Sequence, residues 1–142
     1  MSRNLDREMA FKYMYSLLFE KIEDSKTEKL IFEDVPQTEA PQDESGCFFA
    51  EFCSMAKDNL AYLEGKLAQN LNKNVPKSSV YAIDKAIIFS AMVEIDFMKE
   101  DAPLVITESV RIAKKYSTDN SPKFINGILS SIYTRNVGEK NA

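Results

Sequence analysis

The sequence contains no histidine, and it has only 4 glycines and 5 prolines among its 142 residues. The missing histidine excludes Ser-His-Asp and Cys-His catalysis and removes the commonest ligand of transition metals. The glycines are scattered along the chain, so no glycine-rich loop is available to hold a phosphate. A hydrolase that uses carboxylates stays open in principle, but no paired-acid motif accompanies it. We therefore expect no enzyme, no cofactor and no metal site.

The chain also lacks a long hydrophobic segment. No apolar run approaches the roughly 18 residues that a membrane-spanning helix needs. Charged and polar residues recur from Arg3 to Lys12, where a secretory signal would have its apolar core. We therefore expect a cytoplasmic protein with no membrane association. With 44% hydrophobic and 28% charged residues, the chain is expected to form one domain over residues 1–142 with a sizeable core.

Cys47 and Cys53 are the only cysteines, and aromatic residues surround them in the sequence. Their spacing matches neither a zinc site nor a redox pair. We interpret them as ordinary half-buried thiols on one helix. Reactivity at the surface is the alternative.

Acidic residues are concentrated in one segment. Residues 23–45 contain 8 acids and 2 bases, so they contribute −6 to the net charge of −4 and leave +2 for the rest of the chain. The segment also contains Pro36 and Pro41, and we predict an acidic loop insertion, solvated rather than binding. From Pro103 to Ala142 the charge is +3, because 6 bases face 3 acids. Local charge attracts phosphates, so the C-terminal part is the region suited to nucleic acid.

Apolar residues elsewhere recur at intervals of three and four, the spacing of one buried helix face. The pattern predicts helices over about residues 5–22, 48–71, 79–98, 101–115 and 121–135. A break is expected near Asp58 or Asn59, and fraying after Arg135. The third helix is apolar on nearly every side, so we expect it to be central. Signals for helix starts are Ser78 or Ser79, Asp101 with Pro103, and Ser121 with Pro122.

The string ITESVRIAKKYSTDNSPKFINGIL, at 106–129, contains a helix, a polar turn and the start of a second helix. It resembles the C-terminal signature of the NusB family of bacterial transcription antitermination factors, I-N-E-A-x-x-x-A-K-x-[FY] followed by S-x-K-F-V-N-G-[VI]-L. Thr107 stands where the family usually has Asn. The string IDKAIIFSAMVEI, at 83–95, resembles the family's D-x-A-I-L-R-x-A-x-Y-E-L. Phe89 replaces the usual Arg there, and Val93 replaces the usual Tyr.

The resemblance implies an all-α helical bundle of two packed three-helix subdomains. It also implies binding of boxA-type single-stranded RNA as a heterodimer with NusE, a small-subunit ribosomal protein. Such a heterodimer acts in the transcription elongation complex and supports transcription of ribosomal RNA operons. One alternative is a purely protein-binding helical module, and another is a NusB-like RNA-binding accessory domain for ribosomal RNA processing. The sequence leaves open whether the protein is a monomer or a homodimer.

The turn between the last two helices suits RNA on physical grounds. Lysines and a hydroxyl group can hold phosphates there, and bases can stack on an aromatic ring. Ordinary helix capping with a packed ring is the alternative. The N-terminal string RNLDREMAFKYMY resembles the family's arginine-rich arm R-R-x-R-E-x-A-x-x-x-L-Y with fewer arginines, and solvated surface arginines are the alternative. The candidate RNA-binding residues are Arg3, Arg7, Lys12, Lys114, Lys115, Ser121, Lys123 and Phe124.

The resemblance assigns docking of NusE to Tyr15 and Glu94. On the residues alone, Tyr15 is interpreted as a half-buried ring. Glu94 is interpreted as the acceptor of an intramolecular hydrogen bond or ion pair, which a carboxylate on so apolar a helix needs. Asn126 and Gly127 lie inside the last predicted helix. A glycine there costs roughly 1 kcal/mol relative to alanine, so we expect a neighbouring helix to pass close to it.

Overall fold

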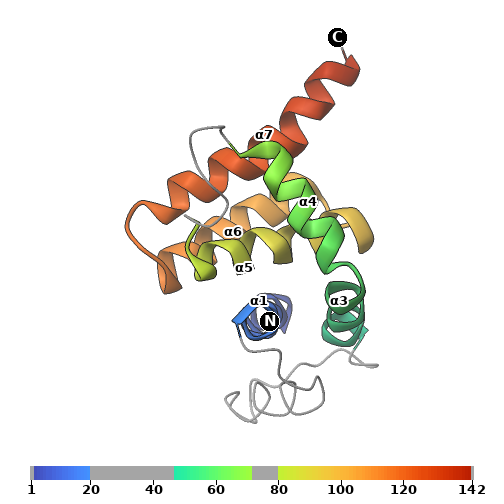
Figure 1. Cartoon of the computed structure of the whole chain (residues 1–142), viewed down its shortest axis with the longest axis vertical. Coiled ribbons are helices and arrows are strands. Elements are labelled where there is room, and N and C mark those ends of the chain that lie inside the picture. Colours follow the sequence, from blue (N-terminus) through green and yellow to red (C-terminus); the bar gives the residue numbers. More distant parts are fainter. Residues whose placement is uncertain (1, 20–46, 72–79, 142) are drawn as a thin grey trace.

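The computed structural model describes residues 2–19, 47–71 and 80–141, without the side chains of Ser2, Phe19, Cys47 and residues 134–141. The described part is helical throughout, which confirms the predicted all-α fold (Figure 1). The predicted acidic insertion at 23–45 lies outside the described residues, as do Ser78 and Ser79. The elements are α1 (Ser2–Phe19), α3 (Cys47–Asp58), α4 (Leu60–Asn70), α5 (Ala82–Met92), the π-helix η3 (Val93–Phe97), α6 (Ala102–Tyr116) and α7 (Ser121–Asn141).

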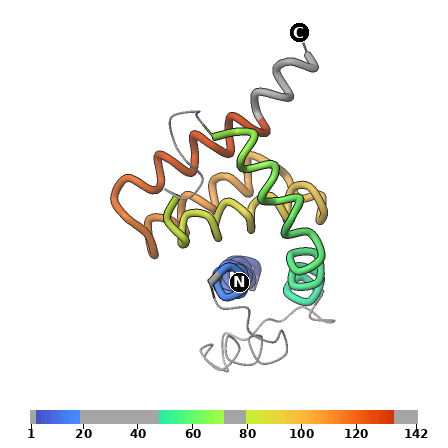
Figure 2. Tube along the Cα trace, viewed as in Figure 1, coloured from blue at the N-terminus to red at the C-terminus, as the bar shows by residue number. Residues whose placement is uncertain are grey.

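The helix α5 is central, as its all-round apolar character predicts. It packs against α1 on one side and against α6 and α7 on the other. The helix α1 also packs against α3, and α6 packs against α7. Figure 2 shows α4 leading away from α3 towards α7, with which it is in contact. The largest fully buried side chains are Tyr13, Phe52, Phe89, Met9, Met14, Leu63, Leu67, Ile87, Ile88, Met92, Ile125 and Leu129.

Local sequence signals explain most of the helix boundaries. The side-chain amide of Asn59 donates to the carbonyl oxygen of Met55 at 2.8 Å, and the helix breaks between α3 and α4 at this residue, as predicted. Asp101 caps α6 by accepting from the backbone N–H of Leu104 at 3.1 Å. The helix α5 begins only at Ala82, without a side-chain cap bond. The helix α7 continues to Asn141, past the point where the sequence suggests fraying.

The end of the central helix is widened into a π-helix. The backbone N–H of Met98 donates to the carbonyl oxygen of Val93 at 3.1 Å, and Lys99 then takes a left-handed conformation with φ 60°. The backbone N–H of Glu100 donates to the carbonyl oxygen of Glu94 at 2.9 Å. Because π-turns re-aim the side chains around them, this geometry brings the carboxylates of Glu94 and Glu100 towards α1.

The expected close approach at Gly127 is wrong. Gly127 is exposed, and a β-carbon built on it would meet no atom within 4 Å. The neighbouring Asn126 is also exposed rather than bonded at a helix crossing. The buried side of α7 consists instead of Ile125, Leu129 and Ile132.

Two further expectations concern cysteine and the membrane. Cys53 is buried in α3, more deeply than the half-buried position expected of it. None of the helices in the described ranges combines the length and hydropathy needed to cross a membrane.

Candidate functional site

The corner between α6 and α7 is held from inside by a buried carboxylate. Asp84, in the first turn of α5, accepts from the Ser117 hydroxyl at 2.5 Å and from the Ser121 hydroxyl at 2.9 Å. The Ser121 oxygen also lies 2.7 Å from the Thr118 hydroxyl oxygen. Ser121 is only 1% exposed, so its hydroxyl fixes the turn and is not presented at the surface. An RNA contact by Ser121 stays a prediction.

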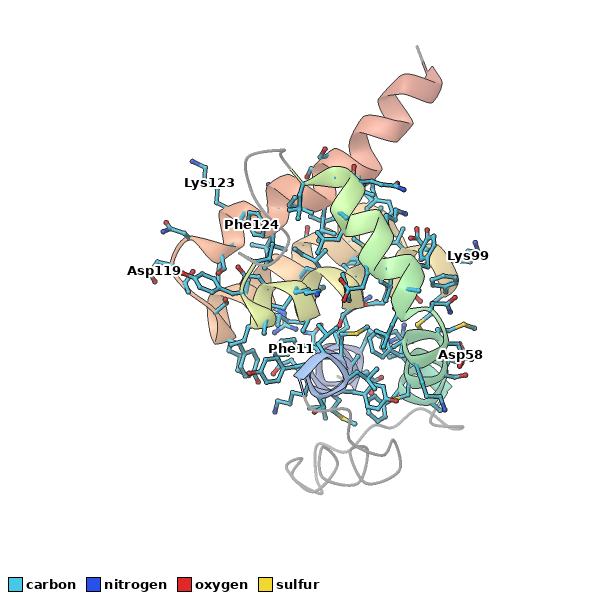
Figure 3. All side chains as sticks on the ribbon, in the orientation of Figure 1. Phe11, Asp58, Lys99, Asp119, Lys123 and Phe124 are labelled. Carbon is cyan, nitrogen blue, oxygen red and sulfur yellow. The ribbon has the colours of Figure 1, made fainter. Side chains whose placement is uncertain are left out.

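The cations of this corner are on the outside. Lys114 ends α6 and Lys123 lies in the first turn of α7, and both are exposed. Neither has an ion-pair partner among the described residues. In Figure 3, Lys123 points away from the body of the protein, whereas Phe124 points towards it. The corner therefore presents two lysines that form no ion pair among the described residues, with the exposed Asp119 in the turn between them.

Phe124 combines packing with partial exposure. Its ring packs against the hydrophobic core and lines a hollow of about 160 Å³ together with Tyr81, which is 62% exposed. The polar residues that line this hollow are Asp84, Thr118, Asn120 and Ser121. Two aromatic rings beside a cationic corner form a surface on which unpaired bases can stack.

A second cationic cluster joins α1 to α6 through Glu8. One Glu8 oxygen accepts from Lys115 at 2.9 Å and from the Tyr116 hydroxyl at 2.7 Å, and the other accepts from Arg111 at 3.1 Å. Burial alone would raise the pKa of Glu8, but these three hydrogen bonds outweigh it and hold the pKa below its usual value. Lys12 lies over the Tyr116 ring, 5.7 Å from its centre. Lys115 is thus paired, although its side chain is still 57% exposed.

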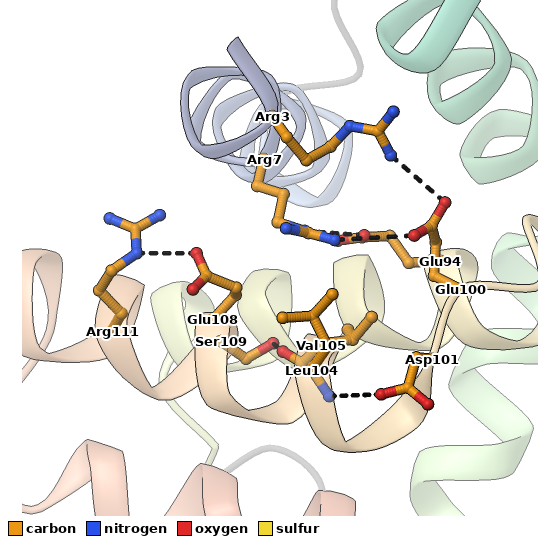
Figure 4. A network of polar contacts seen from close by, with 10 residues as sticks. All are labelled: Arg3, Arg7, Glu94, Glu100, Asp101, Leu104, Val105, Glu108, Ser109 and Arg111. Carbon is orange, nitrogen blue, oxygen red and sulfur yellow. Dashed lines mark hydrogen bonds and ion pairs between the residues drawn. The ribbon is translucent and has the colours of Figure 1, made fainter. Parts of the chain in front are cut away.

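Of the two N-terminal arginines, Arg7 is buried, whereas the side chain of Arg3 is 49% exposed (Figure 4). Arg7 donates from Nε to Glu94 Oε1 at 2.9 Å, and its Nη2 lies 3.8 Å from Glu100. Arg3 donates to Glu100 at 3.3 Å and stacks on the Phe48 ring at 4.4 Å. The four charged groups balance one another between α1, the π-helix and the start of α6.

Burial decides the ionisation of Glu94. Both Arg7 and Glu94 have side chains that are 5% exposed. Burial raises the pKa of Glu94, the attraction and hydrogen bond of Arg7 lower it, and the net effect raises it to about 7. The Arg7 Nε–H can donate to the Glu94 oxygen whether or not the carboxyl group is protonated.

A third carboxylate, Asp96 on the π-helix, links this centre to α4 and α7. One of its oxygens accepts from Lys66 at 2.7 Å, from the Tyr62 hydroxyl at 2.9 Å and from the Tyr133 hydroxyl at 3.1 Å. Burial first, and then the charge of Asp96, raises the pKa of Tyr133, so its hydroxyl stays a donor. The π-helix therefore anchors three helices through Glu94 and Asp96.

The structure separates the candidate residues into two groups. Arg7 and Glu94, suggested as an RNA contact and a NusE contact, are interior partners of each other, because charged groups on so apolar a helix are retained only when paired. The intramolecular pairing expected of Glu94 is confirmed, and the partner contacts suggested for the two residues stay predictions. Tyr15 is half-buried on α1 and packs against the core. The candidates that reach the surface at least in part are Arg3, Lys12, Lys114, Lys115, Lys123, Phe124 and Tyr15.

Sequence reasoning missed Asp84, Glu8 and Arg111. Asp84 has a recognisable signal, since it is an acid in the first turn of a mostly apolar helix and a carboxylate buried there needs a partner. Arg111 and Lys115 are four apart and share a face of α6, so a matching acid on a neighbouring helix was foreseeable. Which acid it is depends on helix packing, which local patterns do not reveal.

The fold and the site define a class of protein: an all-α module whose cationic, aromatic corner suits an anionic partner. The NusB family model matches residues 4–134. The chain belongs to the NusB family.

The relatives agree over most of the chain. It is 31% identical to the transcription antitermination protein NusB of Clostridium novyi, over 93% of this chain and 98% of that protein. It is also 31% identical to the NusB of Chloroflexus aggregans, but that match covers 60% of this chain and 58% of the relative.

Solved structures show the same fold. A NusB of T. maritima superposes with a TM-score of 0.80 at 24% identity, covering 94% of this chain and 92% of that one. A chain from a crystal structure described as antitermination factors NusB and NusE in complex with dsRNA also gives a TM-score of 0.80, at 19% identity, covering 94% and 97%. At these identities the likeness establishes the fold alone.

Proposed function

We propose that this protein is a transcription antitermination factor that binds boxA-type single-stranded RNA together with NusE. In the cytoplasm it would join the transcription elongation complex and support transcription of ribosomal RNA operons. The observation that carries the proposal is the corner of α6 and α7, where Lys114 and Lys123 are exposed and unpaired beside Phe124. Membership of the NusB family supports it, as does the likeness to a NusB chain solved with NusE and RNA.

The surface cations carry the RNA in this proposal. Lys114 and Lys123 hold phosphates at the corner, and a base stacks on the ring of Phe124. Lys12 and Lys115 extend the positive surface along α1 and α6. Arg3 adds little to this surface, because it forms an ion pair with Glu100. Arg7 and Ser121 act from inside, by fixing α1 and the turn.

NusE docks on α1 in the same proposal. Tyr15 is the partly exposed aromatic residue of this helix, and aromatic residues are enriched at protein interfaces. Glu94 acts as a positioning residue, since its bond to Arg7 fixes the rotation and height of α1 on α5.

Fluorescence anisotropy with a labelled boxA-type RNA tests the RNA part. We expect binding that weakens with rising salt and that falls roughly tenfold or more in Lys123→Glu, because one attractive charge becomes repulsive. Lys57→Glu is the matched control. It makes the same charge change at an exposed site of α3, beside Asp58 and across the molecule from Lys123 (Figure 3). Equal losses in the two variants, or no RNA binding by the wild type, would contradict the proposal.

A further inference from the structure

A hollow of about 520 Å³ lies between α6 and α7, beside the corner. It is lined by the cations Arg111, Lys114 and Lys123, by the polar side chains of Thr107 and Asn126, and by the apolar Val110. The volume lies within the range of small-molecule sites, roughly 300–1,000 Å³, and exceeds what one nucleotide needs.

The charge of the hollow is one-sided. No carboxylate lines it, and the first turn of α7 contains no acid. Lys114 and Lys123 have no ion-pair partner among the described residues, unlike their neighbour Lys115. A concave surface with one sign of charge concentrates counter-ions, so the hollow attracts an anion.

Arg111 supplies a donor that the described part of the protein leaves unused. Its Nε and Nη1 donate to Glu108 and Glu8, but its Nη2 is buried and has no hydrogen-bond acceptor among the described residues. A buried donor without an acceptor costs about 1–3 kcal/mol.

The facing surface of α7 is open. Asn126 lines the hollow and is exposed, with no hydrogen bond to another described residue, and Gly127 beside it has empty space where a side chain would be. Nothing within the described protein requires a glycine at this position, although it weakens the helix. A ligand strand that lies against α7 does require one, because a side chain at Gly127 would hold it away.

We propose that this hollow is a second nucleotide subsite, which holds one unit of a single-stranded RNA on the far side of α7 from Phe124. Lys114 and Lys123 bind the phosphates that flank the nucleotide. Asn126 and Thr107 face its base or ribose and provide a preference at that one position, because an amide and a hydroxyl can match a base edge. The inference rests on the proposed function and adds a specificity-determining residue, Asn126, to it.

The test uses the full chain and a labelled boxA-type RNA of about a dozen nucleotides, the length scale of single-strand sites. We expect Lys114→Gln to weaken binding about three- to tenfold and to reduce the slope of log K against log salt by about 0.7. Asn126→Ala should weaken binding roughly fivefold and leave the salt slope unchanged. The wild type and Asn126→Ala are then compared on a series of RNAs, each of which lacks the base at one position. The two proteins should bind equally well only to the RNA that lacks the base recognised by Asn126.

Lys99→Gln is the control, since Lys99 is exposed on the other side of the molecule from Lys123 (Figure 3). If Lys123→Glu abolishes binding while Lys114→Gln and Asn126→Ala bind RNA like the wild type, the subsite is wrong and the proposed function stands. Loss of NusE binding instead of RNA binding in these variants would mean that the hollow is a protein surface, which also overturns the subsite. A wild type that binds no RNA overturns both.

Discussion

Arg7 and Glu94 form a buried pair, 2.9 Å from Nε to Oε1, between residues that are 87 positions apart in the chain. Each has a side chain that is 5% exposed. The pair fastens α1 to the end of the central helix, at the point where a π-helix widens it. The position of α1 on the central helix therefore depends on a buried contact.

Breaking this pair from one side should be expensive. We expect Glu94→Leu to lower the free energy of unfolding by about 3–5 kcal/mol, because Arg7 would stay buried without its main acceptor. The double variant Arg7→Met/Glu94→Leu should recover most of that loss, since two apolar side chains of similar volume need no partner. Urea denaturation of the three proteins measures both effects. A double variant as unstable as the single one would contradict this explanation. It would show that the loss in Glu94→Leu does not come from the unpaired charge of Arg7.

The stability of the protein should depend on pH through Glu94. Burial raises its pKa in the folded state from 4.5 to about 7, so the protonated form is the one that folding favours. The stabilising contribution is fully present below about pH 4.5 and is lost as the pH rises through about 7. We expect the unfolding free energy of the wild type to fall over this window relative to that of Glu94→Gln, which has no proton to lose. A wild-type advantage that grows with pH would contradict this sign and would mean that Arg7 holds the pKa low.

Glu8 should weaken RNA binding, because it forms ion pairs with Lys115 and Arg111 and neutralises their charge. In Glu8→Gln these cations lose their counter-charge, so we expect RNA affinity to rise several-fold with a steeper salt dependence. Stability at neutral pH should fall by about 1–2 kcal/mol, because hydrogen bonds to a charged group are lost. The lowered pKa of Glu8 stabilises the fold above about pH 4.5, so the wild type should lose this advantage over Glu8→Gln as the pH falls below that value. Anisotropy and thermal unfolding measure the two properties separately, and unchanged RNA affinity would show that these cations do not face RNA.

Sequence patterns were sufficient for the helices but not for the roles of charged residues. Asp101 and Pro103 mark the start of α6 because capping is local, and Asn59 marks the break in the second segment for the same reason. Arg7 reads as a surface arginine, since arginine is almost never buried unless paired, and its partner is remote in sequence. The sequence wrongly suggests that Gly127 packs against another helix. Sequence shows that a glycine lowers the stability of the helix, but it does not show what lies next to the residue in space.

Gly127 provides a direct test of stability against function. Gly127→Ala meets no atom within 4 Å, so it should stabilise the protein by about 0.5–1 kcal/mol through helix propensity. Gly65→Ala in α4 is the matched control, with the same open surroundings and the same expected gain. We expect only Gly127→Ala to weaken RNA binding. Equal RNA binding by the two variants would indicate that α7 does not lie against RNA at this residue.

The central claim is that RNA and NusE bind this protein together, and calorimetric titration of cognate NusE tests it most directly. NusE is titrated into the protein alone and into the protein saturated with boxA-type RNA. Linkage requires that each ligand strengthen the other by the same factor, and we predict tightening of at least about fivefold. An equal dissociation constant for NusE with and without RNA would contradict the account.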